Sequence, residues 1–298
     1  MKKVLVAGGA GFIGLEFCKI LNEHNLNYKI VDKLSPATDL LKLSSIKGTA
    51  RLLEKDINKL TFRDVSDCDV IVNFTFSTED EFIVNNISGT LHLLELAKKI
   101  PNFKKFIQIS SDDVYGNLDN NNLSEVNEHG RLEPSTFLST SKISSDLLVI
   151  AASKMYNLPF LITRLCTNFG YSAPQHSLIP SFLNSIKLNQ PITIEGNGNT
   201  IREWMDVEDT TKVLFLLMME QKGIFNVGSG IRVTDNYIAD YIISVSKSNS
   251  KKIYKDSPTH IIGRQGINCE KLKSILGHKL PNFKHLNQFL YESLKSIG

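Results

Sequence analysis

Three glycines near the start of the chain have the spacing of a phosphate-binding loop. Gly8, Gly11 and Gly14 in VLVAGGAGFIG follow a short apolar run and precede a helical pattern. Glycine permits a tight turn and a close approach of the backbone to a pyrophosphate, and the start of the helix offers unpaired N–H groups. We expect Phe12 and Ile13, between two of these glycines, to contact the ligand. The motif predicts a dinucleotide-binding site.

Two acidic residues extend this prediction to the rest of the dinucleotide. Asp32 ends the second β-rich run, about 20 residues on, where a carboxylate can accept hydrogen bonds from both ribose hydroxyls. This favours NAD, because a 2′-phosphate would meet a like charge, although the neighbouring Lys33 leaves NADP open. Asp56 could bind the adenine amino group while Ile57 covers the ring. The alternative for Asp56 is a solvated aspartate at a strand end.

Short β-rich runs alternate with amphipathic helical patterns before residue 170. We expect strands at 3–8, 28–32, 51–57, 68–74, 104–111 and 160–166, and helices at 12–24, 86–100 and 139–156. Such alternation predicts βαβ units and a parallel sheet with helices on both faces. The expected fold class is therefore α/β, with a Rossmann-type doubly wound sheet.

Beyond residue 170, strand and helix patterns no longer alternate regularly. Helices are expected at 177–188, 209–221, 236–247, 269–276 and 286–297, and a strand at 223–229. We expect an NAD-binding domain over 1–170, to which about 205–235 returns. Most of 171–298 then forms a smaller α/β substrate-binding domain.

Composition excludes several other classes. The 298 residues carry a net charge of +3, too small to indicate nucleic acid or a membrane surface, and contain no run of about 18 apolar residues. The four cysteines are far apart and the seven histidines lack metal-ligand spacing. The short apolar run after the first lysines is too brief for a signal peptide. We expect a cytoplasmic protein in a reducing compartment, without a metal.

The segment PSTFLSTSKISSD, residues 134–146, places Leu138 four positions before Lys142. Together with the glycine spacing and SSDDVYG at 110–116, it resembles the extended short-chain dehydrogenase/reductase family. The branch that it is most similar to is that of nucleotide-sugar 4,6-dehydratases and epimerases. NNISGTLHLLELA, LIPSF, GNGNTIREWMDVED and FNVGSG extend the resemblance over the whole chain.

The resemblance implies a role for each matching residue. Ser111 would bond the sugar 4-hydroxyl, Asp112 and Asp113 would form the acid pair, and Lys142 would hold the nicotinamide ribose. Phe74 and Thr75 would contact the cofactor, which we expect to be tightly bound NAD. The expected substrate-binding residues are Ser77, Asn86, Ser111, Thr167, Asn168, Leu178, Arg202 and Arg264. The two arginines would grip the diphosphate, since a fork of N–H donors suits phosphate oxygens.

Four departures from the family pattern bear on the chemistry. Leu138 stands where the family has a catalytic tyrosine, and Asp113 is one methylene shorter than the usual glutamate. Thr167 stands where a substrate-binding asparagine is common. Thr75 and Phe76 replace small alanines. Leucine cannot exchange a proton, so another group must act as the base.

Five groups could replace the tyrosine as base. Asp113 ranks first, Lys142 second if burial lowers its pKa, and Ser111 acting through a water third. Tyr115 and Tyr171 would need a loop to move. If Asp113 were diverted from the acid pair to act as the base, elimination would be impaired more than oxidation.

We therefore expect an NAD-dependent 4-dehydrogenase that stops at the 4-keto sugar. It would be similar to tyrosine-lacking enzymes such as the one acting on GDP-D-glycero-α-D-manno-heptose. NADH would leave or reduce a second substrate such as a 2-oxo acid. Two alternatives stay open: a 4,6-dehydratase or 4-epimerase with a relocated base, and a catalytically dead protein that binds NAD and nucleotide sugars. The helices at 82–98 and 139–156 could pair in a homodimer.

Overall fold

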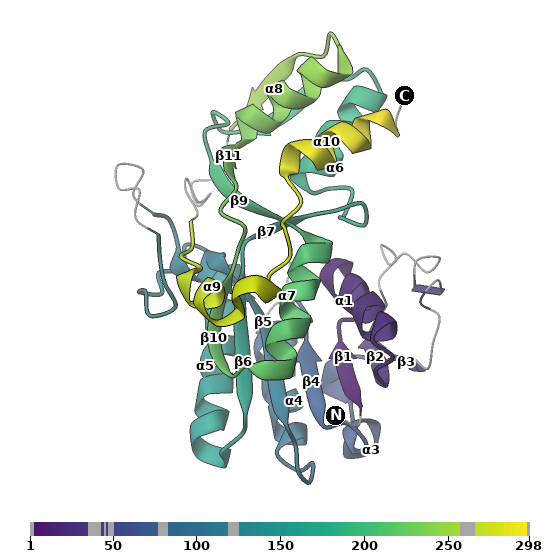
Figure 1. Ribbon diagram of the computed structural model, residues 1–298, viewed down its shortest axis with the longest axis vertical. Coiled ribbons are helices and arrows are strands. Elements are labelled where there is room, and N and C mark those ends of the chain that lie inside the picture. The colour runs from purple at the N-terminus through teal and green to yellow at the C-terminus, as the bar shows by residue number, and fades with distance from the viewer. Residues whose placement is uncertain are drawn as a thin grey trace.

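The computed structural model describes residues 3–34, 43–44, 46, 51–76, 83–118, 125–256 and 266–296, with only the backbone at 84. Its centre is a seven-stranded sheet in the order β10-β6-β5-β4-β1-β2-β3 (Figure 1). The strands are β1 (Val4–Ala7), β2 (Tyr28–Asp32), β3 (Arg51–Glu54), β4 (Val70–Asn73), β5 (Lys105–Ser111), β6 (Phe160–Leu165) and β10 (Gly223–Val227). Every pairing in this sheet is parallel. The predicted doubly wound α/β fold is confirmed.

Burial on both faces of the sheet explains why the inner strands β1 and β4 are almost wholly apolar. In β1, Val4 and Val6 face one core cluster, while Leu5 and Ala7 face another. Alternate residues of a strand point to opposite faces, so a strand covered on both sides must be apolar throughout. The first cluster lies under α1 (Phe12–Glu23) and α7 (Val207–Glu220), which pack against each other.

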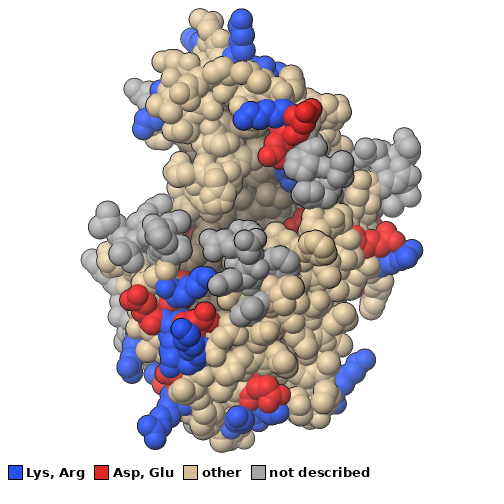
Figure 2. All heavy atoms as spheres, turned by 180° about the vertical axis from the view of Figure 1, so that it is seen from behind, with Lys and Arg blue, Asp and Glu red and all other residues tan. Residues whose placement is uncertain are grey.

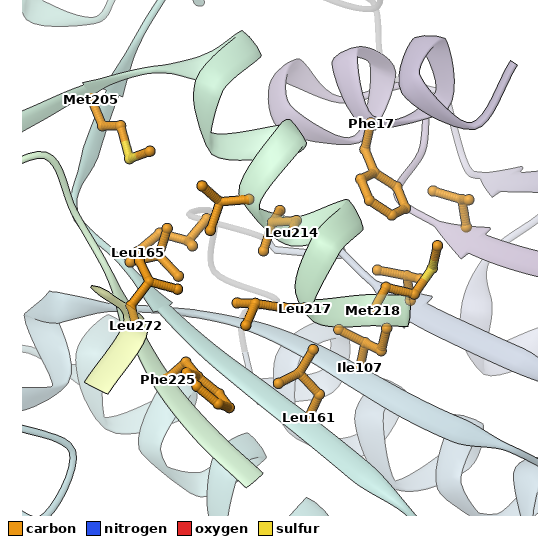
Figure 3. Packing of buried hydrophobic residues seen from close by; sticks show 14 of the residues in the cluster. Phe17, Ile107, Leu161, Leu165, Met205, Leu214, Leu217, Met218, Phe225 and Leu272 are labelled. Atoms are coloured by element: carbon orange, nitrogen blue, oxygen red, sulfur yellow. The ribbon is translucent and has the colours of Figure 1, made fainter. Parts of the chain in front are cut away.

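Figure 3 shows this first cluster from close by. Leu214, Leu217 and Met218 of α7 pack against the sheet. Phe17 of α1 and Ile107 of β5 belong to the same cluster. The opposite face is covered by α4 (Gly89–Ala97) and α5 (Phe137–Tyr156), with α3 (Phe62–Val65) beside α4.

Local signals set the limits of the helices near the sheet's carboxyl edge. Thr136 caps α5 by accepting a 2.9 Å hydrogen bond from the Ser139 N–H, so the helix begins two residues before its predicted start. It ends at Tyr156, and the capping residue Asn157 has a left-handed φ of 51°. A π-helical segment, η2 (Ile83–Ser88), precedes α4 and delays its start to Gly89. Two 3-10 turns, η1 (Ile57–Lys59) and η3 (Asp112–Tyr115), follow β3 and β5.

A smaller lobe lies above the carboxyl edge of the sheet (Figure 1). It holds a three-stranded sheet of β7 (Thr167–Phe169), β9 (Ile201–Asp206) and β11 (Arg232–Thr234), and a pair of β8 (Ile192–Glu195) with β12 (Lys252–Lys255). The helices α6 (Leu178–Lys187), α8 (Asp235–Ser246) and α10 (Leu286–Lys295) pack on them, and α9 (Glu270–Leu276), followed by η4 (Gly277–Lys279), packs on β10. The sequence analysis missed these five strands, because each has three to six residues and none is a continuous apolar run like β1 and β4.

Within the described part of the chain, no helix is long and apolar enough to cross a membrane. The same residues contain no cluster of three or more histidine, cysteine or acidic side chains suited to a metal ion.

Candidate active site

A cavity of about 410 Å³ lies at the carboxyl edge of the central sheet. The predicted cofactor residues that line it are Gly8, Gly11, Phe12, Ile13, Gly14, Phe74 and Lys142, and Ser111 joins them. In an open parallel sheet, ligands bind outside the carboxyl ends of the strands, where loops from neighbouring βα units meet. The structure thus brings the glycine loop and Lys142 to one site although they lie far apart in the sequence.

Close packing explains why the loop requires glycine. Gly8 has a φ of +74°, and a Cβ there would lie 2.9 Å from backbone atoms of both Phe74 and Thr75. A Cβ on Gly14 would lie 2.3 Å from the carbonyl oxygen of Gly8. Without side chains, the first turn of α1 and the end of β4 leave a backbone cradle at the helix N-terminus. This cradle fits the diphosphate of NAD.

Asp32 is tied to the glycine loop in the structure. One carboxylate oxygen accepts a 3.0 Å hydrogen bond from the Ala10 N–H, and the other accepts one of 3.0 Å from the Leu34 N–H. Each carboxylate oxygen has a second lone pair, so the group can still accept from ribose hydroxyls. Lys33 beside it is exposed.

The remaining predicted cofactor residues make local contacts outside this cavity. Asp56 caps η1 through a 2.8 Å bond from the Asn58 N–H. Ile57 is buried, and its side chain packs where Gly89 has no Cβ. Thr75 donates from its N–H to the Asn73 side chain at 3.1 Å. The adenine-binding roles given to Asp56 and Ile57 stay predictions.

Ser111, Asp112 and Asp113 form a compact polar cluster at the end of β5. The Ser111 hydroxyl lies 3.0 Å from an Asp113 carboxylate oxygen and 3.3 Å from one of Asp112. Asp112 is buried, and burial raises the pKa of its carboxyl well above the usual range, with Asp113 and Glu203 adding to the effect. Asp112 therefore favours its protonated form.

Lys142 lies on α5 beside this cluster. Its ammonium nitrogen stands 4.1 Å from the centre of the Phe76 ring, a cation–π contact. Burial lowers the pKa of Lys142, while the carboxylates of Asp113 and Asp112 act in the opposite direction. The lysine is thus a less basic amine than one in water, and it faces the acid pair.

Leu138 and Asn86 do not line the cavity. The Leu138 carbonyl accepts a 2.7 Å bond from the Ser141 hydroxyl, and the Asn86 amide donates to that hydroxyl at 3.0 Å. The backbone carbonyl of Asn86 accepts a further hydrogen bond of 2.6 Å from the Ser145 hydroxyl. Asn86 is therefore seen holding η2 against α5, and its direct contact with substrate stays a prediction.

The two tyrosines considered as replacement bases lie elsewhere. Tyr115 is buried and donates to the Asn226 side chain at 2.7 Å, while Arg164 donates to its hydroxyl at 2.9 Å. Burial raises the pKa of Tyr115. Tyr171 is exposed and its hydroxyl lies 3.2 Å from Glu292. Neither tyrosine lines the cofactor cavity.

A second cavity, of about 350 Å³, lies in the smaller lobe. Four predicted substrate residues line it: Thr167, Asn168, Leu178 and Arg202. Arg202 donates to Asp235 at 3.2 Å, and Asp235 is 2% exposed. Ser77 and Arg264 fall outside the described residues. The surface is hollowed between the two lobes when seen from behind (Figure 2).

The two cavities share Asn168 and Ser177, so they meet there. Sequence reasoning missed Ser177, and it also missed Glu195 and Asp235 in the wall of the second cavity. No motif marks these positions. The only available signal was the alternation of apolar and polar residues at 192–195.

Known proteins resemble this chain over nearly its whole length. The model of the NAD dependent epimerase/dehydratase family matches residues 4–228. The low-salt glycan biosynthesis protein Agl12 of Haloferax volcanii is 31% identical over 289 residues, which cover 91% of this chain and 92% of that protein. The dTDP-glucose 4,6-dehydratase of Haemophilus influenzae is 29% identical over 322 residues and 93% of each chain.

A solved structure shows the same similarity in three dimensions. The crystal structure of dTDP-glucose 4,6-dehydratase from Bacillus anthracis in complex with NAD superposes with a TM-score of 0.90 at 28% identity, over 99% of this chain and 96% of that one. The resemblance drawn from the sequence is confirmed, and with it the class of NAD-dependent enzymes. Since the family model matches more than half of the residues, the chain belongs to the NAD dependent epimerase/dehydratase family.

Proposed function

We propose that this protein oxidises the 4-hydroxyl of a nucleotide-linked sugar with NAD and releases a 4-keto sugar that keeps its 6-hydroxyl. The best candidate substrate is GDP-D-glycero-α-D-manno-heptose. One observation carries the proposal: Leu138 stands where the family has its tyrosine, while the glycine cradle and Lys142 still line one cavity.

The glycine loop and Lys142 would hold the cofactor, which fits the cradle described above. NAD held there would supply the acceptor for the hydride that leaves carbon 4. Positioning of this kind supplies a large part of catalysis and does not depend on the lost tyrosine. General-base catalysis contributes a further factor of roughly 100 to 10,000, so a replacement base is needed.

Asp113 is the base that the contacts favour. The Ser111 hydroxyl donates to its carboxylate at 3.0 Å and accepts from the Asp113 N–H at 3.3 Å, which leaves one lone pair on the serine oxygen for a sugar hydroxyl. A sugar hydroxyl that donates to Ser111 could pass its proton through the serine to Asp113. Burial raises the pKa of the Asp112 carboxyl and so favours its protonated form, which makes Asp113 the better candidate to accept this proton.

The same contact explains why the reaction would stop at the ketone. In the family, the acid pair removes a proton at carbon 5 and protonates the leaving hydroxyl at carbon 6. Asp113 has a shorter side chain than glutamate and is engaged by Ser111. A carboxylate used for oxidation is less available for elimination.

Mass spectrometry of nucleotide sugars tests the proposal directly. The purified protein would be incubated with UDP-, dTDP- and GDP-linked sugars, with and without 2-oxoglutarate as an acceptor for the electrons of NADH. Loss of two hydrogens from one sugar supports the 4-dehydrogenase. Loss of water as the main reaction would overturn it in favour of a 4,6-dehydratase, a rival that the Haemophilus influenzae relative favours. Binding without any transfer of hydrogen would favour a dead binding protein.

We also propose a homodimer formed through α4 and α5. These two helices pack together and carry exposed apolar side chains, namely Leu91, Phe137, Leu147 and Met155. Large apolar groups gathered on one surface are typical of protein interfaces. Light scattering after gel filtration should give twice the chain mass, and Leu147→Glu should return the monomer.

A further inference from the structure

One wall of the substrate cavity is strand β8, none of whose residues lines the cofactor cavity. Thr193 and Glu195 line the cavity, and both are exposed. Ile192 and Ile194, which alternate with them, are buried in the core of the smaller lobe, and Ile194 also lines the cavity between them. Because side chains alternate along a strand, Thr193 and Glu195 project from the same face of β8. The edge of the cavity formed by β8 therefore carries a hydroxyl and a carboxylate on either side of Ile194.

The position of β8 identifies the part of the substrate that it would face. The two cavities meet at Asn168 and Ser177, and no residue of β8 lines the cofactor cavity. The carbon that is oxidised must lie near Lys142, so the sugar occupies the shared end. The nucleoside, at the other end of the diphosphate, then extends toward β8. This placement rests on the proposed function.

The charges on this wall favour a ligand that donates hydrogen bonds. Arg202 is engaged by Asp235 through a 3.2 Å ion pair. Glu195 is close enough to Asp235 to add to the rise in its pKa, which burial causes and Arg202 opposes. Among the described residues, Glu195 shows no hydrogen bond or ion pair within the chain. Its carboxylate can only accept, so it suits N–H groups.

The bases differ in what they offer to a carboxylate. Guanine presents an N1–H next to its exocyclic amino group, so it can donate two parallel bonds to the two oxygens. Adenine and cytosine each present one amino group beside a ring nitrogen that only accepts. Uracil and thymine present one N–H between two carbonyl oxygens, which a carboxylate repels. Hydrogen bonds to an ionised acceptor are also stronger than neutral ones.

We propose that Glu195 selects guanine nucleotides by accepting hydrogen bonds from the N1–H and the exocyclic amino group of the base. The Thr193 hydroxyl lies on the same face of β8 and is available to donate to a carbonyl oxygen such as O6. The protein would thus discriminate among nucleotide sugars at the end of the cavity opposite to the chemistry.

Calorimetric titration with free nucleotides tests this selection without catalysis. GDP, IDP, UDP and dTDP would be titrated into the NAD-loaded full chain. IDP keeps the N1–H of guanine but lacks its amino group. We expect GDP to bind at least tenfold more tightly than UDP or dTDP, with IDP between them. Equal binding of all four, or tighter binding of UDP or dTDP, would overturn the proposal.

The variant Glu195→Gln separates base recognition from ribose recognition. It should lose at least tenfold in affinity for GDP and change less than twofold for UDP, because only guanine offers two donors to the carboxylate. Glu270→Gln is the matched control, since Glu270 is exposed on α9 and outside the cavity. An equal loss for every nucleotide would assign Glu195 to the ribose hydroxyls instead. Melting temperatures within 2 °C of the parent would show that the variants fold.

The selection of guanine and the proposed reaction can each fail without the other. If GDP is preferred and lost in Glu195→Gln, but no GDP-sugar loses two hydrogens, then the proposed reaction fails and the guanine selection stands. If a UDP- or dTDP-sugar loses two hydrogens, then the reaction stands and the guanine selection fails.

Discussion

The cofactor cavity and the substrate cavity meet at two residues but differ in what lines them. The first is lined by backbone of the glycine loop and by apolar groups, with Lys142 as its cation. The second is lined by aromatic side chains together with Arg202, Asp235 and Glu195. A cofactor held mainly through backbone N–H groups can be bound by any sequence that forms the same turn. The choice of substrate depends instead on a few side chains from separate segments.

The largest effect should come from the group that takes the proton, which we assign to Asp113 beside Ser111. Asp113→Asn should reduce kcat by roughly 100- to 10,000-fold, the usual contribution of a general base. Steady-state rates of the parent and of the variant measure this loss.

The pH profile of kcat between pH 5 and 10 checks this assignment. Lys142 acts as a base only when deprotonated, so with Lys142 as base the rate would climb with pH. Because burial lowers the pKa of Lys142, that climb would be centred below the ordinary lysine value of about 10.4. Such a rise of kcat with pH, together with a mild effect of Asp113→Asn, would identify Lys142 as the general base instead of Asp113.

Binding of the cofactor should be lost through a change of backbone shape alone. Gly8→Ala adds a Cβ that meets the backbone of residues 74 and 75 at 2.9 Å, and NAD affinity should fall at least 100-fold. Gly230→Ala is the matched control, because Gly230 has a φ of +81° and open space around it. The control should cost about 1–2 kcal/mol of stability from the left-handed φ and leave NAD affinity within twofold. Fluorescence titration with NADH measures both.

Binding of the substrate should be weakened by the loss of one charged side chain. Arg202→Ala should weaken binding of a nucleoside diphosphate by about 10- to 100-fold and leave NAD affinity unchanged, because Arg202 lines only the second cavity. Arg131→Ala, which removes an exposed arginine paired with Glu133, should change neither affinity. Calorimetry on both variants provides the comparison. A parallel loss of NAD binding in Arg202→Ala would show that the two cavities are not independent.

The smallest effect is expected at Leu138. If Asp113 already takes the proton, Leu138→Tyr should change the rate of oxidation by less than tenfold. Leu138→Phe controls for the ring without the hydroxyl. The product mixture is read by mass spectrometry. A strong rise in water loss with tyrosine, absent with phenylalanine, would favour a dehydratase that lost its base.

Most of the central sheet could be predicted from the sequence, and little of the smaller lobe. The predicted strand at 28–32 has the same limits as β2, and the other predicted strands of this sheet agree to within three residues at either end. Their apolar runs are strong signals because both faces are buried. In the smaller lobe, β8 has only four residues and half of them are exposed, so its pattern is weak.

The cofactor loop was readable because its residues are consecutive and glycine there has a steric reason. By contrast, the sequence did not indicate that the Asn86 amide donates to Ser141, and the contact of Asn86 with substrate stays a prediction. Nothing in the sequence states that η2 packs on α5.

The sequence by itself determined the doubly wound sheet, the phosphate cradle and the absence of a tyrosine four residues before Lys142. These properties depend on local spacing and on residue type, which are visible in one chain. Only the tertiary structure decided that Ser111 bonds Asp113, that Arg202 is held by Asp235, and that Glu195 borders the same cavity as Asn168. Such neighbours are set by long-range packing, in which residues far apart in the chain become adjacent without any local signal.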